Sequence, residues 1–467
     1  MRTKTKLYGE ALRILVVFLS LFLCLFGDSA VSVKDDVIDS IFGAFVLSSR
    51  NPGTQWMIFL CFAIYLLTFL FLQHQISGEG FWRAVDPSAW LMGMLIFGTL
   101  AYTFNYVDAA QSPQALILLL GAALGSGATV WSIWGRRDRI GGSVRNLIVT
   151  ALVVLLFASS LWPPEWGLTF GYRGYARWTG PWDYPNSYGL LMGVGIVLAL
   201  GSAVMNCEML VVGKSADGSC KDWETGWKVI CEMLCLVSAG TFCRGLLHSY
   251  SRGAWFGTSI GLVYLATQTI NKYRSKYRRW IRGNVCSLAI ATISIFALSC
   301  WHYRQTEWRP AQRAFSAINT RDFTARNRIA AWESISQIMA EHPWCGVGWN
   351  QPATLYQNYY FSTETFDSAP IELNDYLWLG ATLGIPALVC FGMYIWLCLR
   401  NRRWELGTVN RIPEDCPPTV KTLDSMRDTC RAGAIVLLVG FWFDGGLFRL
   451  HTAATFWILI ELGRQDR

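Results

Sequence analysis

Apolar runs alternate with short polar segments along almost the whole chain of 467 residues. Most runs are about 18 to 22 residues long, and roughly 20 residues of helix cross the hydrocarbon core of a bilayer. Because lipid offers no hydrogen-bond partners, the backbone groups of a span must be satisfied within the helix itself. The pattern predicts an all-α, polytopic helical membrane protein with about twelve transmembrane helices. These lie near residues 11–28, 54–74, 87–106, 113–134, 146–163, 187–212, 227–243, 252–270, 284–301, 371–399, 432–446 and 451–463.

The first apolar run fits two interpretations. Its basic flank and the small residue Ala30 are compatible with a cleaved signal peptide. We expect an uncleaved first span instead, because so many further spans follow it.

Only one polar segment between the predicted spans is long. Residues 302–370 separate nine spans in residues 1–301 from the last three spans and a basic loop in residues 371–467. Long loops commonly carry function. Inside this one, the stretch "RNRIAAWESISQIM" predicts an amphipathic helix that can lie on the outer face of a membrane. Its apolar positions are Ile329, Trp332, Ile335, Ile338 and Met339.

Basic residues gather in the loops on one side of the predicted spans, which the positive-inside rule identifies as cytoplasmic. They occur in "MRTKTK", "RRDRIGGSVR", "NKYRSKYRRWIRG" and the region Arg400–Arg431. The extracytoplasmic side then contains Ser29–Gly53, Trp162–Asn186, a short turn at Arg244–Ser251 and the long loop. The net charge of +8 follows from this topology. We therefore expect the lipid bilayer, and no nucleic acid, as a partner.

The extracytoplasmic basic residues are nearly all arginines, whereas lysine is frequent on the cytoplasmic side. The outer arginines are Arg173, Arg177, Arg244, Arg252, Arg304, Arg309, Arg313, Arg321, Arg326 and Arg328, with Lys34 as the exception. A guanidinium offers a planar fork that matches phosphate and carboxylate oxygens. This bias indicates anion recognition outside the membrane. The 14 cysteines show no metal-ligand spacing, so we expect buried thiols and no metal site.

The stretch "SYSRGAW" places an arginine at the outer end of the eighth predicted span. Ser251 is the expected N-cap, Arg252 the first helical residue, and Gly253 allows another backbone to approach. Free N–H groups, the positive end of the helix dipole and a guanidinium then favour a phosphate. The alternative is an arginine that reaches up to the outer headgroups.

The amphipathic helix repeats this arrangement. Asn327 is placed to cap it, so that Arg328 stands at a helix N-terminus, with Arg326 as a further binding residue. The alternative is a surface helix with a solvated arginine.

Two further extracytoplasmic motifs carry polar side chains. In "YRGYARWTGPWDYPNSYG", Arg177, Trp178, Asp183 and Asn186 can bind sugar hydroxyls, or the stretch is a structured turn leading into the sixth span. In "APIELNDYLWLGATLGIPAL", polar side chains stand where the chain re-enters the membrane, and carboxylates at this depth tend to be functional. Acidic residues at a helix N-terminus are also ordinary partners of the dipole. The residues concerned are Glu372, Asn374 and Asp375.

Taken in order, the motifs "RWTGPWDYPNSYG", "SYSRGAW", "RIAAW…EHPWCGVG" and "LNDYLWLGATLGI" resemble those of the O-antigen ligase and Wzy-polymerase-like superfamily of bacterial membrane proteins. The resemblance covers approximately residues 170–400 and the twelve-span layout. It implies a metal-independent, inverting glycosyltransferase of the GT-C type that uses no cofactor. The implied donor is a glycan on undecaprenyl diphosphate, and the acceptor is a hydroxyl of lipid A-core, of another glycan or of a protein. The implied location is the bacterial inner membrane, with the active site facing outward.

The resemblance also implies residue roles. Arg252 matches the arginine of the family's "SRG" motif and Arg328 that of its long outer loop, and both are expected to bind the lipid diphosphate. The family usually has His-Asn where this chain has Leu373-Asn374, and that histidine is the expected base for the acceptor hydroxyl. Leucine cannot take a proton. Glu372 or Asp375 is then expected as the base, with His248 and His342 as the alternatives. A further alternative is that the activity is altered or lost.

Two other functions fit twelve spans. A transporter or flippase of lipid-linked glycans is expected to have charged or broken segments at mid-span and two related halves. Here the arginines lie at span ends, no clear repeat is present, and Asp444 is the main residue that favours transport. A structural partner in an envelope assembly complex is the third possibility.

Overall fold

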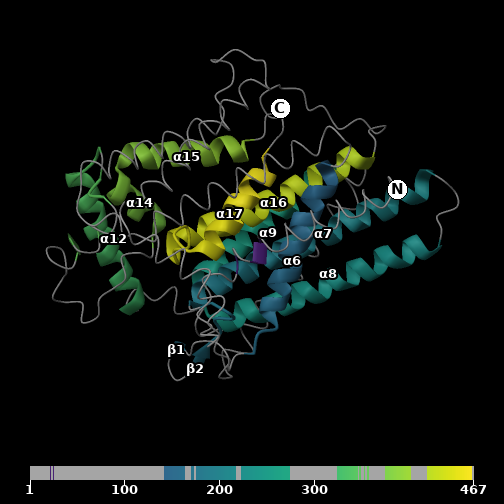
Figure 1. Ribbon diagram of the computed structural model, residues 1–467, viewed down its shortest axis with the longest axis horizontal. Coiled ribbons are helices and arrows are strands. Elements are labelled where there is room, and N and C mark those ends of the chain that lie inside the picture. Colours follow the sequence, from purple (N-terminus) through teal and green to yellow (C-terminus); the bar gives the residue numbers. More distant parts are fainter. Residues whose placement is uncertain are drawn as a thin grey trace, which may run out of the picture. The chain divides into compact units, whose positions relative to one another are not determined.

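The computed structural model describes 11 helices and strands and the turns that adjoin them (Figure 1). The described residues are 141–163, 170–172, 175–182, 184–216, 222–273, 323–344, 346–348, 374–400 and 418–464, with Leu21, Phe22, Leu25, Pro352, Leu355 and Tyr356. The chain divides into two compact units. Unit 1 comprises Met1–Ala151, Asn327–Asn410 and Phe441–Arg467, and unit 2 comprises Leu152–Arg326 and Arg411–Gly440.

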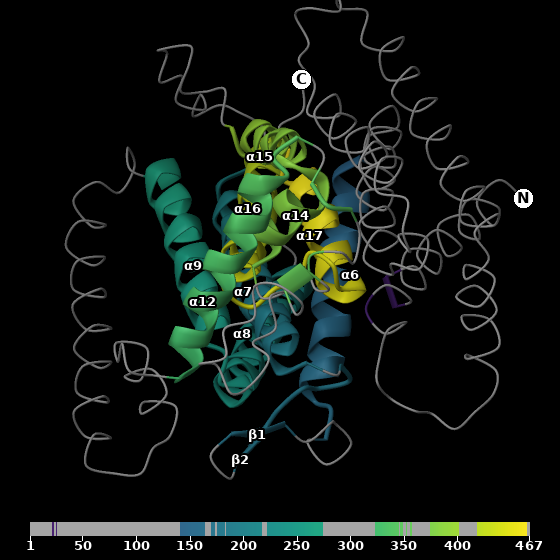
Figure 2. The ribbon, with the colours of Figure 1, turned by 90° about the vertical axis from the view of Figure 1, so that its left-hand side faces the viewer.

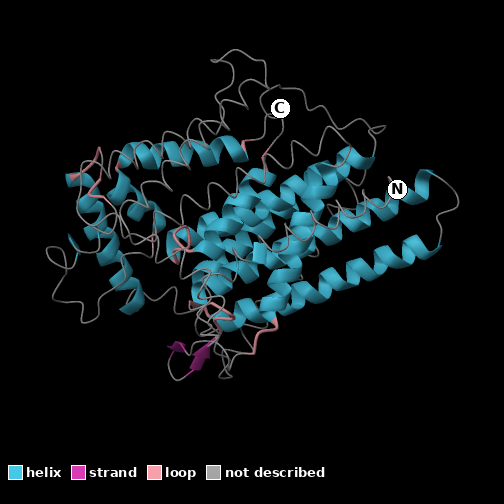
Figure 3. Cartoon of the chain, in the orientation of Figure 1, coloured by secondary structure: helices cyan, strands magenta, loops and turns pink. Residues whose placement is uncertain are grey.

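Helices make up nearly all of the described secondary structure (Figure 3). They are α6 (Gly141–Ser160), α7 (Pro185–Ala216), α8 (Asp222–Ser249), α9 (Arg252–Tyr273), α12 (Phe323–Glu341), α14 (Asp375–Leu383), α15 (Ile385–Leu399), α16 (Pro418–Phe443) and α17 (Leu450–Leu462). One antiparallel hairpin joins β1 (Phe170–Tyr172) and β2 (Tyr175–Arg177), with Phe170 opposite Arg177. The predicted all-α class is thus confirmed for the described part of the chain, apart from these two short strands.

Two helices among the described residues are long and apolar enough to cross a membrane, over Pro185–Met205 and Ile230–Ser249. Shorter apolar helices occupy Arg145–Ser160, Ile385–Leu399 and Leu450–Leu462. The predicted spans at 54–74, 87–106, 113–134 and 284–301, and most of 11–28, lie outside the described residues. The count of about twelve spans and their orientation therefore stay predictions, as does the division at residues 301 and 370.

The prediction of one continuous helix for the tenth span, over 371–399, is wrong. The described part of this stretch forms two separate helices, α14 and α15, which meet at Gly384. The turn that follows α12 supplies the physical reason. Its Val347 N–H donates to the carbonyl of Ala381 (2.8 Å) and its Gly348 N–H to that of Thr382 (3.0 Å). These carbonyls at the end of α14 are therefore satisfied without a continuing helix. Gly384 has φ 90°, a left-handed conformation that glycine adopts at little cost.

Unit 2 is built around α7, which packs against both α8 and α9 (Figure 1). Small residues make this approach close. A Cβ at Gly189 would lie 3.1 Å from Ala254 of α9, and one at Gly257 of α9 would lie 2.6 Å from the carbonyl oxygen of Val436 in α16. Close backbone approach through small residues is the usual way in which apolar helices pack in lipid. The β1–β2 hairpin lies at the C-terminal end of α8 (Figure 2).

Unit 1 has its core between α12 and α14. The α12 residues Ala331, Ile335 and Ile338 are at most 2% exposed and pack with Trp378 and Ala381 of α14. The predicted amphipathic helix is therefore confirmed as a helix, and these apolar residues pack against α14, while its position on a membrane surface stays a prediction. The exception is Ile329, which is 53% exposed.

We expect Gly257→Ala to lower the free energy of unfolding by about 1–3 kcal/mol, because the added methyl group meets backbone that cannot move away like a flexible side chain. Gly240→Ala is the matched control, since a Cβ there meets nothing within 4 Å. Alanine improves helix propensity by up to about 1 kcal/mol, so this variant should not be destabilised. Thermal unfolding in detergent, followed by tryptophan fluorescence, measures both. Equal melting temperatures for the two variants would contradict the packing described for α9 and α16.

Candidate functional site

The α8–α9 turn presents Arg252 at the first position of α9. As predicted, Ser251 caps this helix: its Oγ accepts the N–H of Ala254 at 3.1 Å, and the side chain is buried. Tyr250 takes the left-handed φ of 52°. The turn itself is shorter than predicted, because α8 continues through Ser249, so that residues 244–249 are helical.

The C-terminal end of α8 is held from outside the helix. The carbonyls of its last four residues each accept a hydrogen bond, which leaves no orphan acceptor there. The donors are Trp255 Nε1 to Leu246 (2.9 Å), Tyr250 N to Leu247 (3.2 Å), Trp178 N to His248 (3.1 Å) and Arg177 Nε to Ser249 (2.8 Å). The end of β2, the residue that follows it and the first turn of α9 therefore fix the backbone that leads to Arg252.

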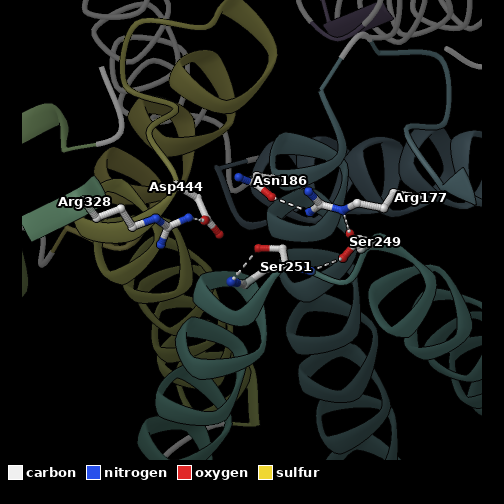
Figure 4. Close-up of polar contacts among 7 residues, drawn as sticks. Arg177, Asn186, Ser249, Ser251, Arg328 and Asp444 are labelled. Atoms are coloured by element: carbon white, nitrogen blue, oxygen red, sulfur yellow. Dashed lines mark hydrogen bonds and ion pairs between the residues drawn. The ribbon is translucent and has the colours of Figure 1, made fainter. Parts of the chain in front are cut away.

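Arg177 and Asn186, both predicted to bind sugar, are bonded to each other. Arg177 Nη2 donates to Asn186 Oδ1 at 2.6 Å, while its Nε donates to the backbone carbonyl of Ser249 (Figure 4). Asn186 is 5% exposed, at the start of α7. This arrangement favours the structured-turn interpretation of the motif for these two residues. Asp183, the third predicted sugar ligand, lies outside the described residues.

Trp178 forms a stack on the outer surface of α8. Its ring lies parallel to that of His248, with centroids 4.3 Å apart and planes at 17°, and Arg244 Cζ lies 5.0 Å from the ring centroid. Arg244 and His248 are four residues apart and so share one face of α8. His248, an alternative base, therefore has a ring face occupied by the indole.

Arg328 lies on α12, and its Nη2 pairs with Asp444 Oδ1 at 3.3 Å (Figure 4). Its Nε–H is buried and has no hydrogen-bond acceptor in the described part of the chain. A buried donor without an acceptor costs about 1–3 kcal/mol, so this nitrogen is suited to an acceptor brought by a ligand. Asp444, the residue that favoured transport, is thus an ion-pair partner between α16 and α17.

The placement of Arg328 at a helix N-terminus was wrong. α12 begins at Phe323, so Arg328 stands in its second turn and Asn327 is inside the helix rather than its cap. The segment Phe323–Arg326 contains no Gly or Pro, and Ala325 and Arg326 are good helix formers, so the helix begins earlier than predicted. The helix dipole therefore supports Arg252 but not Arg328. The side chain of Arg326 lies outside the described residues.

Asn374 and Asp375 both have structural contacts at the start of α14. Asn374 is the N-cap, and its side chain accepts the N–H groups of Tyr376 and Leu377 at 3.1 Å each. Asp375 is 2% exposed, and its Oδ2 accepts the N–H of Leu447 at 2.7 Å. Glu372 and Leu373 lie outside the described residues.

Two histidines of unit 1 are candidates for the base that Leu373 cannot provide. His342 follows the end of α12, and thirteen or so helical residues place it roughly 20 Å from Arg328 along the axis. It is therefore poorly placed to serve the same reacting group. His451 is fully buried at the start of α17, within the sequence segment that follows Asp444. Sequence reasoning missed it because it lies inside an apolar run with no motif around it.

The described residues include no group of three or more His, Cys, Asp or Glu side chains that could hold a metal ion. Arg252 belongs to unit 2 and Arg328 to unit 1. Their predicted convergence on one diphosphate, like the roles of the other site residues, stays a prediction.

Residues 237–392, about a third of the chain, match the family model described as O-antigen ligase. The match includes the "SRG" turn, Arg328 and the start of α14. The comparison with curated proteins gives no significant match. At a coarse level, the family indicates a membrane enzyme that transfers glycosyl groups between a lipid-linked glycan and an acceptor. The resemblance to the O-antigen ligase-like superfamily found from the ordered motifs is therefore confirmed by the family match over residues 237–392.

Proposed function

We propose that this protein transfers a glycan from an undecaprenyl-diphosphate-linked donor to an acceptor hydroxyl, on the outer face of the bacterial inner membrane. The acceptor is a hydroxyl of lipid A-core, of another glycan or of a protein. The observation that carries the proposal is the O-antigen ligase match over residues 237–392. Both arginines that the sequence suggested for the diphosphate, Arg252 and Arg328, fall inside it.

The proposed reaction needs positive charge more than it needs a metal. The acceptor oxygen attacks the anomeric carbon from the face opposite the diphosphate, which inverts the configuration there. The bond between the anomeric carbon and the phosphate oxygen breaks, and both of its electrons leave with undecaprenyl diphosphate. The acceptor proton passes to a base. Guanidinium groups that are already in position stabilise the charge that develops on the leaving phosphate.

The surroundings of Arg252 suit this role. It stands at the N-terminus of a 22-residue helix, where the dipole favours an anion. The preceding turn is held by the Arg177 side chain, which donates to the Ser249 carbonyl, and by two local hydrogen bonds, from the Ser251 N–H to Ser249 Oγ and from the Ala254 N–H to Ser251 Oγ. A fixed backbone lowers the reorganisation that binding a diphosphate demands.

The surroundings of Arg328 support the role in a different way. Its charge is balanced by Asp444, but its buried Nε–H has no acceptor among the described residues. A phosphate oxygen would supply that acceptor through a charge-assisted hydrogen bond. The ion pair and the phosphate therefore use different nitrogens of the same fork.

The base is proposed to be Glu372 or Asp375. Asp375 is buried, and one oxygen of its carboxylate accepts a backbone N–H from Leu447. Glu372 is two residues before the N-cap Asn374, where the chain enters α14.

Arg252→Ala and Arg328→Ala are each expected to reduce transfer by at least about 10²–10³-fold, the usual loss when one group that stabilises a transition-state anion is removed. Arg→Lys at either position should restore little, because a point charge replaces a planar fork. Transfer is measured with purified protein and a lipid-linked donor, as a change in acceptor mass.

Arg400→Ala serves as the control for these arginine variants. It removes a guanidinium that stacks on Trp396 at 4.7 Å, on the predicted cytoplasmic side. It should insert and transfer normally. Near-normal transfer by both Arg252→Ala and Arg328→Ala would remove the site assignment, and an unchanged donor and acceptor with wild-type protein would favour a transporter.

Asp375→Asn separates the two roles of Asp375, because the amide oxygen still accepts the Leu447 N–H but no longer takes a proton. If Asp375 is the base, this variant loses transfer and the acidic limb of its pH–rate profile, while its melting temperature stays near wild type. Glu372→Gln is measured in parallel. Normal rates in both would send the search to His248, His342 and His451.

A further inference from the structure

Asp444 is a buried carboxylate that forms an ion pair with Arg328. Its side chain is 2% exposed, that of Arg328 is 18% exposed, and Nη2 and Oδ1 lie 3.3 Å apart (Figure 4). Removing one member of such a pair leaves a charge in a poorly solvated position, which is strongly unfavourable. The pair therefore restricts where the guanidinium of Arg328 can lie.

The turn that carries Asp444 is held in place by other contacts. Gly445 and Gly446 have φ values of 69° and 146°, which turn the chain sharply between α16 and α17. Leu447 donates its N–H to Asp375 at the start of α14, and Thr452 donates its hydroxyl to the carbonyl of Gly446. The carboxylate of Asp444 thus stands on backbone that is fixed from two sides.

Aromatic packing also holds α12, which carries Arg328, in place. Trp332, one helical turn after Arg328 on α12, packs against Trp442 with centroids 6.0 Å apart and planes at 66°. Trp442 in turn packs against Tyr376 of α14 at 5.8 Å. These ring contacts keep α12 beside the end of α16. They therefore hold the aliphatic part of Arg328 close to Asp444.

We propose that Asp444 is a positioning residue, which orients the guanidinium of Arg328 so that its Nε–H stays available for a phosphate oxygen of the donor. This inference rests on the proposed function. Asp444 takes one nitrogen of the fork and leaves Nε–H without an acceptor among the described residues. Asp444 itself touches neither the glycan nor the diphosphate, and acts only through Arg328.

A positioning role makes a specific kinetic prediction. Asp444→Asn keeps the shape of the side chain but weakens its hold on the guanidinium. Misplacing a catalytic group by about 1 Å can cost about 10²-fold in rate, so kcat should fall by about 10- to 100-fold. The KM for the lipid-linked donor should change by less than about threefold, because ground-state binding through the other contacts persists. Asp444→Glu retains the charge and should recover part of kcat.

The matched control is Glu461→Gln, which removes the charge of another buried carboxylate in unit 1. Glu461 is 8% exposed and accepts a hydrogen bond from Tyr394 at 2.6 Å, and it is paired with Arg464 rather than Arg328. Melting temperature is measured for every variant, and kcat is expressed per folded protein. Glu461→Gln should leave kcat unchanged even where its melting temperature falls.

The outcomes separate this inference from the proposed function. Loss of transfer in Arg328→Ala with a kcat within twofold of wild type in Asp444→Asn overturns the positioning role alone. An equal fall of kcat in Asp444→Asn and Glu461→Gln also overturns it, since it would indicate general damage to unit 1. Normal transfer in Arg328→Ala removes the proposed site itself.

Discussion

The need to satisfy backbone groups at helix ends governs this fold. An apolar helix that stops inside a protein leaves four carbonyls and four N–H groups without partners, and lipid offers none. At the end of α8 the acceptors are met by Trp178, Arg177, Tyr250 and Trp255. At the end of α14 the turn after α12 does the same. In both places a helix stops because another segment of its own unit replaces the missing turn.

These helix ends are also where the candidate chemistry lies. Capping of α8 fixes the turn that presents Arg252, and capping of α14 fixes the helix whose first residue is Asp375. The two arginines are nevertheless prepared differently. Arg252 stands at a capped helix N-terminus, whereas Arg328 stands within a helix and forms an ion pair with Asp444. The first guanidinium is at the positive end of a helix dipole, and the second is next to a buried carboxylate.

Sequence patterns located the motifs more reliably than they assigned each side chain its task. The N-cap at Ser251 and the helix after Arg326 were predicted from local rules, and both are present. Arg177 was predicted as a sugar ligand because guanidinium groups bind polar ligands. Instead it donates to Ser249, which is 72 positions away in the sequence. No local rule identifies such a partner, because the pairing depends on how β2 packs against the end of α8.

The sequence by itself determined the helical class, the apolar runs and the ordered motifs that reveal the family, because periodicity, charge and spacing are properties of neighbouring residues. Only the tertiary structure decided that the run over 371–399 breaks at Gly384 and that α12 turns its apolar face toward α14. It also decided that Asp444 forms an ion pair with Arg328. Each of these depends on hydrogen bonds, packing or charge between segments far apart in the chain. Such contacts form only when the helices are packed, so spacing along the sequence does not encode them.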